Sequence, residues 1–163
     1  MKIEYKFRKF TNKDYEYVYE LKKKAYIEYV IANWGKWDEE AQKEYFKKFV
    51  NTYKNTMYII VNENDDIGFY NDDILENGNY EIGNICIDEK YQGMGIGTKI
   101  LTDILEKYKN YNIELQYFKQ NRVGELYKRL GFKENGETNF HYKMIKPRKI
   151  WYCFVYKTNY FIM

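Results

Sequence analysis

The chain has 163 residues, the length of one ordinary domain, which leaves little room for a second. Hydrophobic residues make up 45% of it and charged residues 31%, enough for both an apolar core and a hydrated surface. The net charge of +3 is too balanced to indicate nucleic-acid binding, which usually depends on basic residues gathered on one face.

Signals for membrane insertion, secretion and metal binding are weak. The first ten residues alternate apolar and charged side chains, unlike a signal peptide, and no apolar run approaches the ~18 residues that cross a bilayer. We therefore expect a cytoplasmic protein that does not insert into a membrane. Cys86 and Cys153 lie far apart, and His141 is the single histidine, so the ligands of a Cys/His zinc site are too few. We expect no bound metal.

The first third of the chain predicts one strand and two helices. Residues 3–7 alternate apolar and charged side chains, which is typical of a half-buried strand. Apolar residues then recur at helical spacing over residues 15–32, after Thr11 or Asn12 as a cap. Asp38 is the predicted N-cap of a second helix, because acidic residues follow it in the first turn.

The rest of the chain predicts three strands, a helix, a strand, a helix and a closing hairpin. The expected bounds, in that order, are 56–61, 67–75, 80–87, 95–109, 111–118, 121–130 and 132–144. Since no internal repeat or linker interrupts this order, we expect a single α+β domain.

A glycine-rich turn joins the third of these strands to the next helix. Gly93, Gly95 and Gly97 alternate with other residues directly before the helical pattern. The unpaired N–H groups of a helix N-terminus favour anions, and glycines let a phosphate approach the backbone. The turn therefore indicates a phosphate-binding loop, with a flexible turn that binds no ligand as the alternative.

Two other nucleotide-binding signatures compete with this interpretation. A Walker A loop needs Gly-Lys-Ser/Thr, whereas Gly97 is followed by Thr98 and then Lys99. A dinucleotide fingerprint needs G-x-G-x-x-G directly after its strand, whereas here the spacing is G-x-G-x-G and residues 88–92 intervene. Because Glu114 lies near the position of a ribose-binding acid, a nucleotide-binding oxidoreductase stays open at this point.

Two motifs, in order, resemble the signatures of the GNAT N-acetyltransferases. Gln92-x-x-Gly95-x-Gly97 matches the Gln/Arg-x-x-Gly-x-Gly/Ala signature with which that family binds acetyl-CoA. Asn121, followed by a small residue, Leu126-Tyr127 and Gly131-Phe132, matches the second signature. Together, about 25–30 residues apart, they form a much more specific signal than either motif alone.

The resemblance implies a GNAT domain over residues 1–147, with a mixed, mostly antiparallel sheet of six to seven strands flanked by about four helices. Residues 148–163 depart from the family, because they are aromatic and apolar beyond its usual last strand. We expect them to add an edge strand or to cover a dimer contact, so a homodimer is possible.

The resemblance also implies the reaction. The protein would be an acyltransferase that takes acetyl-CoA as co-substrate and passes the acetyl group directly to a primary amine of a small molecule or a protein. The alternative is a catalytically silent acyl-CoA-binding sensor on the same fold.

The implied cofactor-binding residues fall in three segments. They are Ile85, Cys86 and Ile87 on a strand edge that pairs with the pantetheine arm; Gln92, Gly93, Met94, Gly95, Ile96, Gly97 and Thr98 around the pyrophosphate; and Asn121 and Tyr127 near the arm and its sulfur. Cys86 is expected to be a small buried side chain and not a nucleophile, because it lies inside an apolar strand.

Two residues take catalytic roles by the same resemblance. Tyr127 corresponds to a general acid, and a phenol suits this role because it is neutral at pH 7 and can protonate a thiolate. Glu81 corresponds to a general base that acts through water in some relatives. The alternatives are that Tyr127 is a core aromatic and that Glu81 is an exposed residue at a strand end.

The amine pocket of the family is usually shaped by the first two helices and the loop between them. Here that region contains four aromatic residues that we expect to bind substrate: Tyr26, Tyr29, Trp34 and Trp37. Aromatic rings beside carboxylates suit a cationic amine. The alternative is that both tryptophans simply pack the helical corner.

Overall fold

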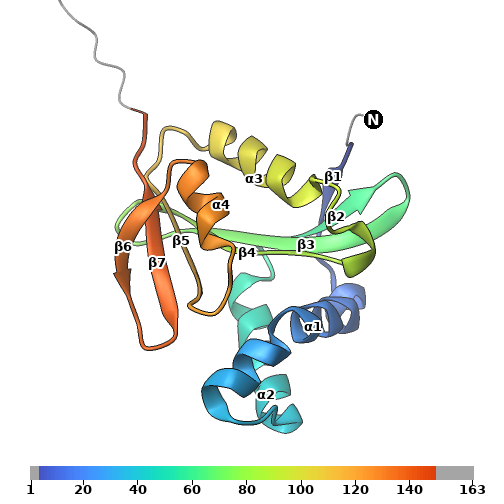
Figure 1. Cartoon of the computed structure of the whole chain (residues 1–163). Helices are drawn as coiled ribbons and strands as arrows, with labels where there is room; N and C mark the ends of the chain where they lie inside the picture. Colours follow the sequence, from blue (N-terminus) through green and yellow to red (C-terminus); the bar gives the residue numbers. More distant parts are fainter. Residues whose placement is uncertain (1–3, 150–163) are drawn as a thin grey trace, which may run out of the picture.

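Seven strands form one sheet with helices on both of its faces (Figure 1). The computed structural model describes residues 4–149. The strands are β1 (Lys6–Lys9), β2 (Met57–Asn62), β3 (Asp65–Ile74), β4 (Tyr80–Ile87), β5 (Ile113–Phe118), β6 (Lys133–Glu137) and β7 (His141–Lys146). The helices are α1 (Tyr15–Trp34), α2 (Glu39–Tyr53), α3 (Ile96–Lys107) and α4 (Gly124–Arg129), with short 3₁₀ turns at Asn12–Asp14 and Glu89–Tyr91. The predicted order of elements is confirmed.

The sheet runs in the order β1-β2-β3-β4-β5-β7-β6. Every neighbouring pair is antiparallel except β4 and β5, which are parallel. The predicted α+β class and the mixed, mostly antiparallel sheet are therefore confirmed. A dinucleotide-binding domain needs a doubly wound parallel sheet, which this topology does not provide.

Asp38 is the N-cap of α2, as predicted, whereas the predicted cap Thr11 precedes the 3₁₀ turn Asn12–Asp14 and the N-cap of α1 is Asp14. Thr11 forms a capping box with Asp14, whose carboxylate also receives the guanidinium of Arg8 at 2.8 Å. Asp38 caps α2 by accepting a hydrogen bond from the N–H of Ala41 at 3.1 Å. Asp38 thereby satisfies a backbone N–H group that the start of α2 leaves unpaired. The carboxylate of Asp14 accepts instead from the N–H and the hydroxyl of Thr11, ahead of α1.

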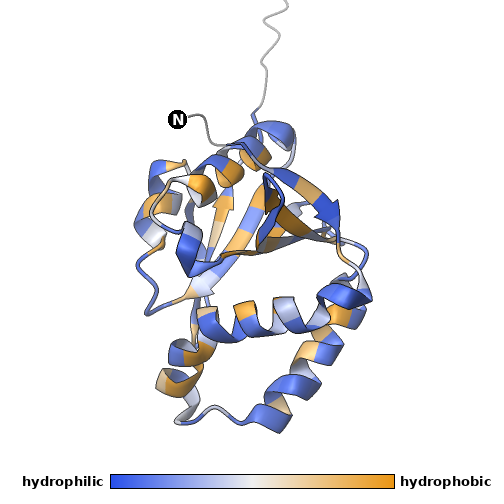
Figure 2. Ribbon diagram, turned by 90° about the vertical axis from the view of Figure 1, so that its right-hand side faces the viewer, coloured by the Kyte–Doolittle hydropathy of each residue, from blue (hydrophilic) through white to orange (hydrophobic). Residues whose placement is uncertain are grey.

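Two hydrophobic clusters fill the space on either side of the sheet. One lies under α3 and α4 and contains Ile100, Ile104 and Phe132. The other lies against α1 and α2 and contains Val18 and Phe46. Hydrophobic residues are prominent in the central strands and recur along the helices (Figure 2). The sheet is thus buried on both faces, and its central strands hold residues of both clusters.

The parallel pair β4 and β5 opens into a wedge. The two strands pair only at Tyr80 with Ile113 and at Glu81 with Glu114. Beyond Glu81, β4 pairs with β3 alone over its remaining length. The last part of β4 therefore has one free edge in the middle of the sheet, where backbone groups are open to a ligand.

A bulge lies in β4 at the mouth of this wedge. The register with β3 shifts between Asn71 and Asp72, where Gly83 is the extra residue opposite β3. A β-carbon at Gly83 would collide with the side-chain amide of Asn71, so this position requires glycine. Because of the extra residue, Glu81 and Asn84 lie on the same face of the strand although they are three positions apart in the sequence.

The predictions for the C-terminal tail stay open. Residues 150–163 lie outside the described residues, and so does Cys153. The predicted domain boundary after Pro147 and the predicted edge strand or dimer contact therefore remain predictions. Within residues 4–149, no helix is long and apolar enough to cross a membrane.

Candidate active site

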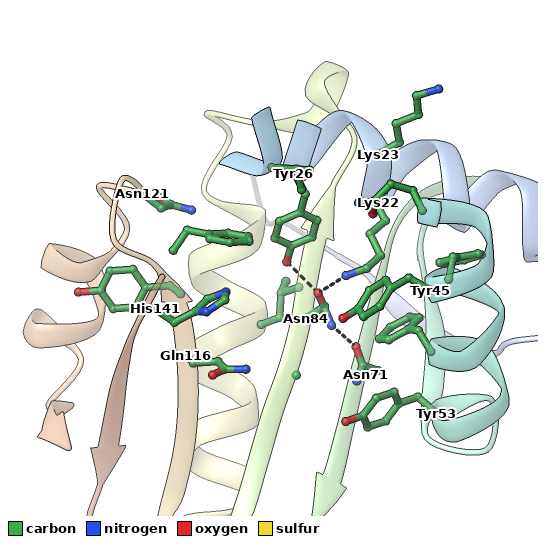
Figure 3. A pocket seen from close by; sticks show the side chains of 18 of the residues that line it. Lys22, Lys23, Tyr26, Tyr45, Tyr53, Asn71, Asn84, Gln116, Asn121 and His141 are labelled. Carbon is green, nitrogen blue, oxygen red and sulfur yellow. Dashed lines mark hydrogen bonds between the residues drawn. The ribbon is translucent and has the colours of Figure 1, made fainter. Parts of the chain in front are cut away.

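A cavity of about 760 Å³ lies between α1, α2 and the open part of the sheet. Figure 3 shows side chains from α1, α2, β3, β4 and β5 converging on it. Its wall includes Tyr26 and Lys22 from α1, Tyr45 from α2, and Glu81 and Asn84 from β4. Aromatic rings thus surround a few polar groups, which is the usual composition of a small-molecule site.

A chain of hydrogen bonds crosses the floor of the cavity (Figure 3). The side-chain oxygen of Asn84 accepts from the ammonium of Lys22 at 3.1 Å and from the hydroxyl of Tyr26 at 2.7 Å. The amide nitrogen of Asn84 donates to the oxygen of Asn71 at 2.7 Å. Residues of α1, β3 and β4 are held together by this network, which fixes the position of the Lys22 ammonium.

The predicted phosphate-binding loop lies at the end of β4 and the start of α3. Gly93 and Gly95 have φ angles of 73° and 80°, which favour glycine. Gly97 is under no such constraint, because a β-carbon there would lie 3.8 Å from Ile87, an ordinary contact. The backbone N–H groups of residues 93–98 donate no hydrogen bond within residues 4–149. The loop therefore offers free donors and open space, as a diphosphate requires.

Two predicted cofactor-binding residues make contacts inside the protein. The side-chain amide of Gln92 donates to the carbonyl of Ile87 at 2.7 Å, and the N–H of Gln92 donates to Glu89 at 3.2 Å. Gln92 thus holds the loop against the end of β4. Ile96 is buried in the core, so only its backbone is available to a ligand. Met94 has an exposed side chain beside the loop.

Of the three predicted strand-edge residues, only Cys86 is buried, so it can offer only backbone groups to a ligand; Ile85 and Ile87 are half-buried, and Ile85 lines the cavity. Ile85 and Ile87 pack against the cluster under α3, and Cys86 is buried in the cluster under α1 and α2. Burial raises the pKa of the Cys86 thiol to about 11, so it is protonated at neutral pH. A protonated, buried thiol is a poor nucleophile, which agrees with the structural role predicted for it.

Asn121 and Tyr127 lie on the opposite wall, before and within α4. The side-chain oxygen of Asn121 accepts from the N–H of Val123 at 3.0 Å, which leaves its amide nitrogen open. Tyr127 packs against the rings of Tyr117 and Phe132 and lines the cavity. Burial raises the pKa of Tyr127 to about 12, so its hydroxyl is a neutral proton donor at pH 7.

Glu81 lies at the point where β4 and β5 separate and lines the cavity. Burial raises the pKa of its carboxyl, and the nearby carboxylates of Asp73 and Glu114 raise it further. A carboxylate with a raised pKa is a better proton acceptor than a free one. The position and the electrostatics of Glu81 therefore suit a general base.

Three of the four predicted substrate-binding aromatics line the cavity: Tyr26, Trp34 and Trp37. Tyr29 does not line it and stacks on Phe118, with 5.3 Å between ring centroids. The indole N–H of Trp37 donates to Glu39 at 2.8 Å. The loop between α1 and α2 thus contributes to the wall of the cavity. Tyr29 packs against Phe118, which itself lines the cavity.

Several cavity residues were missed by the sequence reasoning. They are Lys22, Asn71 and Asn84 in the network, Tyr45, Phe49 and Tyr53 on α2, and Phe118 on β5; His141 on β7 also lines the cavity. An asparagine inside a largely apolar strand, as at Asn71 and Asn84, was the available signal. Burial against Phe118 lowers the pKa of His141, so this imidazole is neutral at pH 7.

Comparison with known proteins agrees with this fold. Residues 54–134, about half of the chain, match the family model described as "Acetyltransferase (GNAT) domain". They include β4, the glycine loop, α3 and α4. The chain belongs to the GNAT superfamily of acetyltransferases.

The curated relatives include the spermine/spermidine N(1)-acetyltransferase of Bacillus subtilis (strain 168). It is 34% identical over 84 residues, which cover 48% of this chain and 55% of that protein. The match thus spans about half the length of the relative.

Solved structures share the fold over most of their length. A Pyrococcus horikoshii OT3 protein has 23% identity and a TM-score of 0.67, with 90% of this chain and 100% of that chain covered. The PaiA N-acetyltransferase of Thermoplasma acidophilum, solved in complex with coenzyme A, has 20% identity and a TM-score of 0.66 over 89% and 99% of the two chains.

Proposed function

We propose that this protein is an acetyl-CoA-dependent N-acetyltransferase that passes the acetyl group directly to a primary amine of a small molecule or a protein. The observation that carries this proposal is the free edge of β4, which ends in the free backbone N–H groups of residues 93–98. That combination suits a ligand with an amide-bearing arm and a diphosphate.

Acetyl-CoA supplies an activated acyl group, and the protein must bind it and manage two protons. We assign the diphosphate to the N–H groups of residues 93–98 and the arm to the backbone of residues 85–87. The open amide nitrogen of Asn121 is a further donor on the opposite wall. None of these groups needs a positive side chain, because the helix N-terminus provides the favourable potential.

The first proton belongs to the amine. An alkylamine is protonated at pH 7, with an unperturbed pKa near ~10.4, and must lose this proton before it attacks. We assign its removal to Glu81, directly or through water, because its carboxyl lines the cavity and has a raised pKa.

The second proton belongs to the leaving thiolate. We assign its delivery to Tyr127, whose hydroxyl lines the same cavity and makes no hydrogen bond within residues 4–149. Because this hydroxyl has no hydrogen bond to give up, it can donate to the sulfur of the leaving thiolate without breaking another contact.

The acceptor is an amine, and polyamines are one candidate because the relative from Bacillus subtilis is named for spermine and spermidine. The experiment is a thiol-release assay with acetyl-CoA and a panel of amines, run beside calorimetric titration with coenzyme A. We expect coenzyme A to bind and thiol to appear only when an amine is present. Tight binding with no release on any amine would instead indicate a silent acyl-CoA sensor.

A further inference from the structure

Lys22 places an unpaired positive charge in the cavity. The other two lysines that line it are already paired, Lys23 with Glu39 at 2.8 Å and Lys36 with Asp38 at 3.4 Å. Across the described part of the chain, Lys22 forms no ion pair, and its hydrogen-bond partner is the neutral Asn84.

The ammonium of Lys22 is held in position from several sides. It lies 4.3 Å from the ring centroid of Tyr26 and 4.7 Å from that of Phe49. Lys22 and Tyr26 both donate to Asn84, so the atom of Asn84 that faces them is its oxygen, and its nitrogen faces Asn71. The network thus fixes the orientation of the Asn84 amide and holds the ammonium of Lys22, a hydrogen-bond donor on α1, at the cavity.

Burial makes this charge costly. It lowers the pKa of Lys22 to about 8, so the side chain is still mostly protonated at pH 7. The neighbouring thiol of Cys86 is neutral and cannot offset the charge. Two ring faces and one amide oxygen only partly replace lost hydration, and an anion in the cavity would complete the compensation.

The cavity also contains a carboxylate on the same strand face. Glu81 lies two ladder positions from Asn84, because Gly83 is the extra residue of the bulge. Two positions along a strand correspond to about 7 Å. The distance between Glu81 and the Lys22–Asn84 pair therefore matches the distance between the charged groups of a small zwitterion. Aromatic rings of α1 and α2 line the cavity around them.

We propose that Lys22 binds a carboxylate of the acceptor, so that the acceptor is a small amine that also carries a carboxylate and an apolar body, as in an amino acid. This inference rests on the proposed function, since it names the acceptor class of the same site. A polyamine fits less well, because its second cationic group would meet the unpaired ammonium of Lys22.

The test uses acceptors that differ only at the carboxylate: phenylalanine, phenylalaninamide and phenethylamine, with spermidine as the polycation. Each is titrated into the complex with coenzyme A, and each is assayed for thiol release with acetyl-CoA. We expect wild type to prefer phenylalanine in both measurements. Lys22→Gln keeps a donor to Asn84 without the charge, and should reduce that preference about tenfold to a hundredfold.

Lys23→Met is the matched control, because Lys23 lines the cavity but its charge is already paired with Glu39. We expect it to keep the preference. Lys22→Met removes the charge and keeps an apolar side chain of similar length. A thermal melt of each variant shows whether it is still folded.

Two results would overturn the inference. One is equal or tighter binding of phenylalaninamide or spermidine by wild type. The other is an equal loss of turnover with every acceptor in Lys22→Gln, which would place Lys22 at the thioester and not at the acceptor. Because binding is measured without turnover, a carboxylate preference that depends on Lys22 would stand even if no thiol were released, and the proposed function alone would fail.

Discussion

Gly97 faces Ile87 across the start of α3, and a β-carbon added at Gly97 would lie 3.8 Å from Cγ1 of Ile87. The protein's own packing therefore leaves room for a side chain at this position. The open space lies beside free backbone N–H groups, so a phosphate could reach them directly.

Gly97→Glu should separate folding from cofactor binding. A carboxylate in the first turn of a helix is favourable by about 0.3–1 kcal/mol, so the melting temperature should stay level or rise. The same carboxylate should repel the diphosphate and weaken coenzyme A binding at least tenfold, measured by calorimetry. Gly97→Gln, of equal size without the charge, should weaken binding less. Equal binding by Gly97→Glu and wild type would remove the diphosphate from this loop.

Tyr127→Phe should lower kcat by about a hundredfold if the phenol protonates the leaving thiolate, since general acid catalysis typically contributes that much or more. Coenzyme A binding should be nearly unchanged, because the ring keeps its contacts with Tyr117 and Phe132. Tyr142→Phe is the control, because Tyr142 is exposed and does not line the cavity. An unaltered kcat in Tyr127→Phe would rule out the general-acid role.

Glu81 should make kcat/KM fall on the acid side of its pH profile. Since the active form of a base is deprotonated, kcat/KM should rise with pH through the Glu81 pKa, which lies above its ordinary value of 4.5. Asp73→Asn removes a neighbouring negative charge that raises this pKa, so it should move this fall to lower pH. Glu81→Gln should abolish the fall and most of the activity. A pH profile that Asp73→Asn leaves in place would contradict the assignment.

Asp14 should stabilise the fold above pH 4 and lose this effect in acid. The Arg8 guanidinium and the hydrogen bonds from Thr11 lower its pKa from the ordinary 3.8. A folded pKa below the unfolded one stabilises the protein above 3.8, and the stabilisation disappears as the pH falls toward the folded pKa. Asp14→Asn should cost about 1–3 kcal/mol of unfolding free energy at pH 7, measured by urea denaturation, and less at pH 3. Equal losses at both pH values would contradict this role.

The order of the elements was readable from the sequence because each depends on local patterns. Alternation predicted the strands, and Asp38 at the start of α2 followed from capping chemistry. The glycine loop was also local, since its conformation depends on Gly93 and Gly95 themselves.

The Lys22 network could not be predicted in the same way. It joins α1 to β3 and β4 across 62 residues, between Lys22 and Asn84, and depends on the packing of whole elements. Helical periodicity marks a lysine as a surface residue, and it gives no sign that a helix face meets a polar strand residue. Tyr29 is a related case, because it stacks on Phe118 and does not line the cavity, and this contact between helix and strand has no local signal in the sequence.

The bulge at Gly83 has a consequence for transferring residue roles between relatives. In a regular strand, residues 81 and 84 would point to opposite sides of the sheet, one toward α1 and the other toward α3. A homologue with a perfectly alternating β4 would therefore present a different set of side chains to its acceptor, even where its residues align one for one with these. Roles should be matched by counting from the β3 partner, Asn71 to Asn84, and not from the glycine loop.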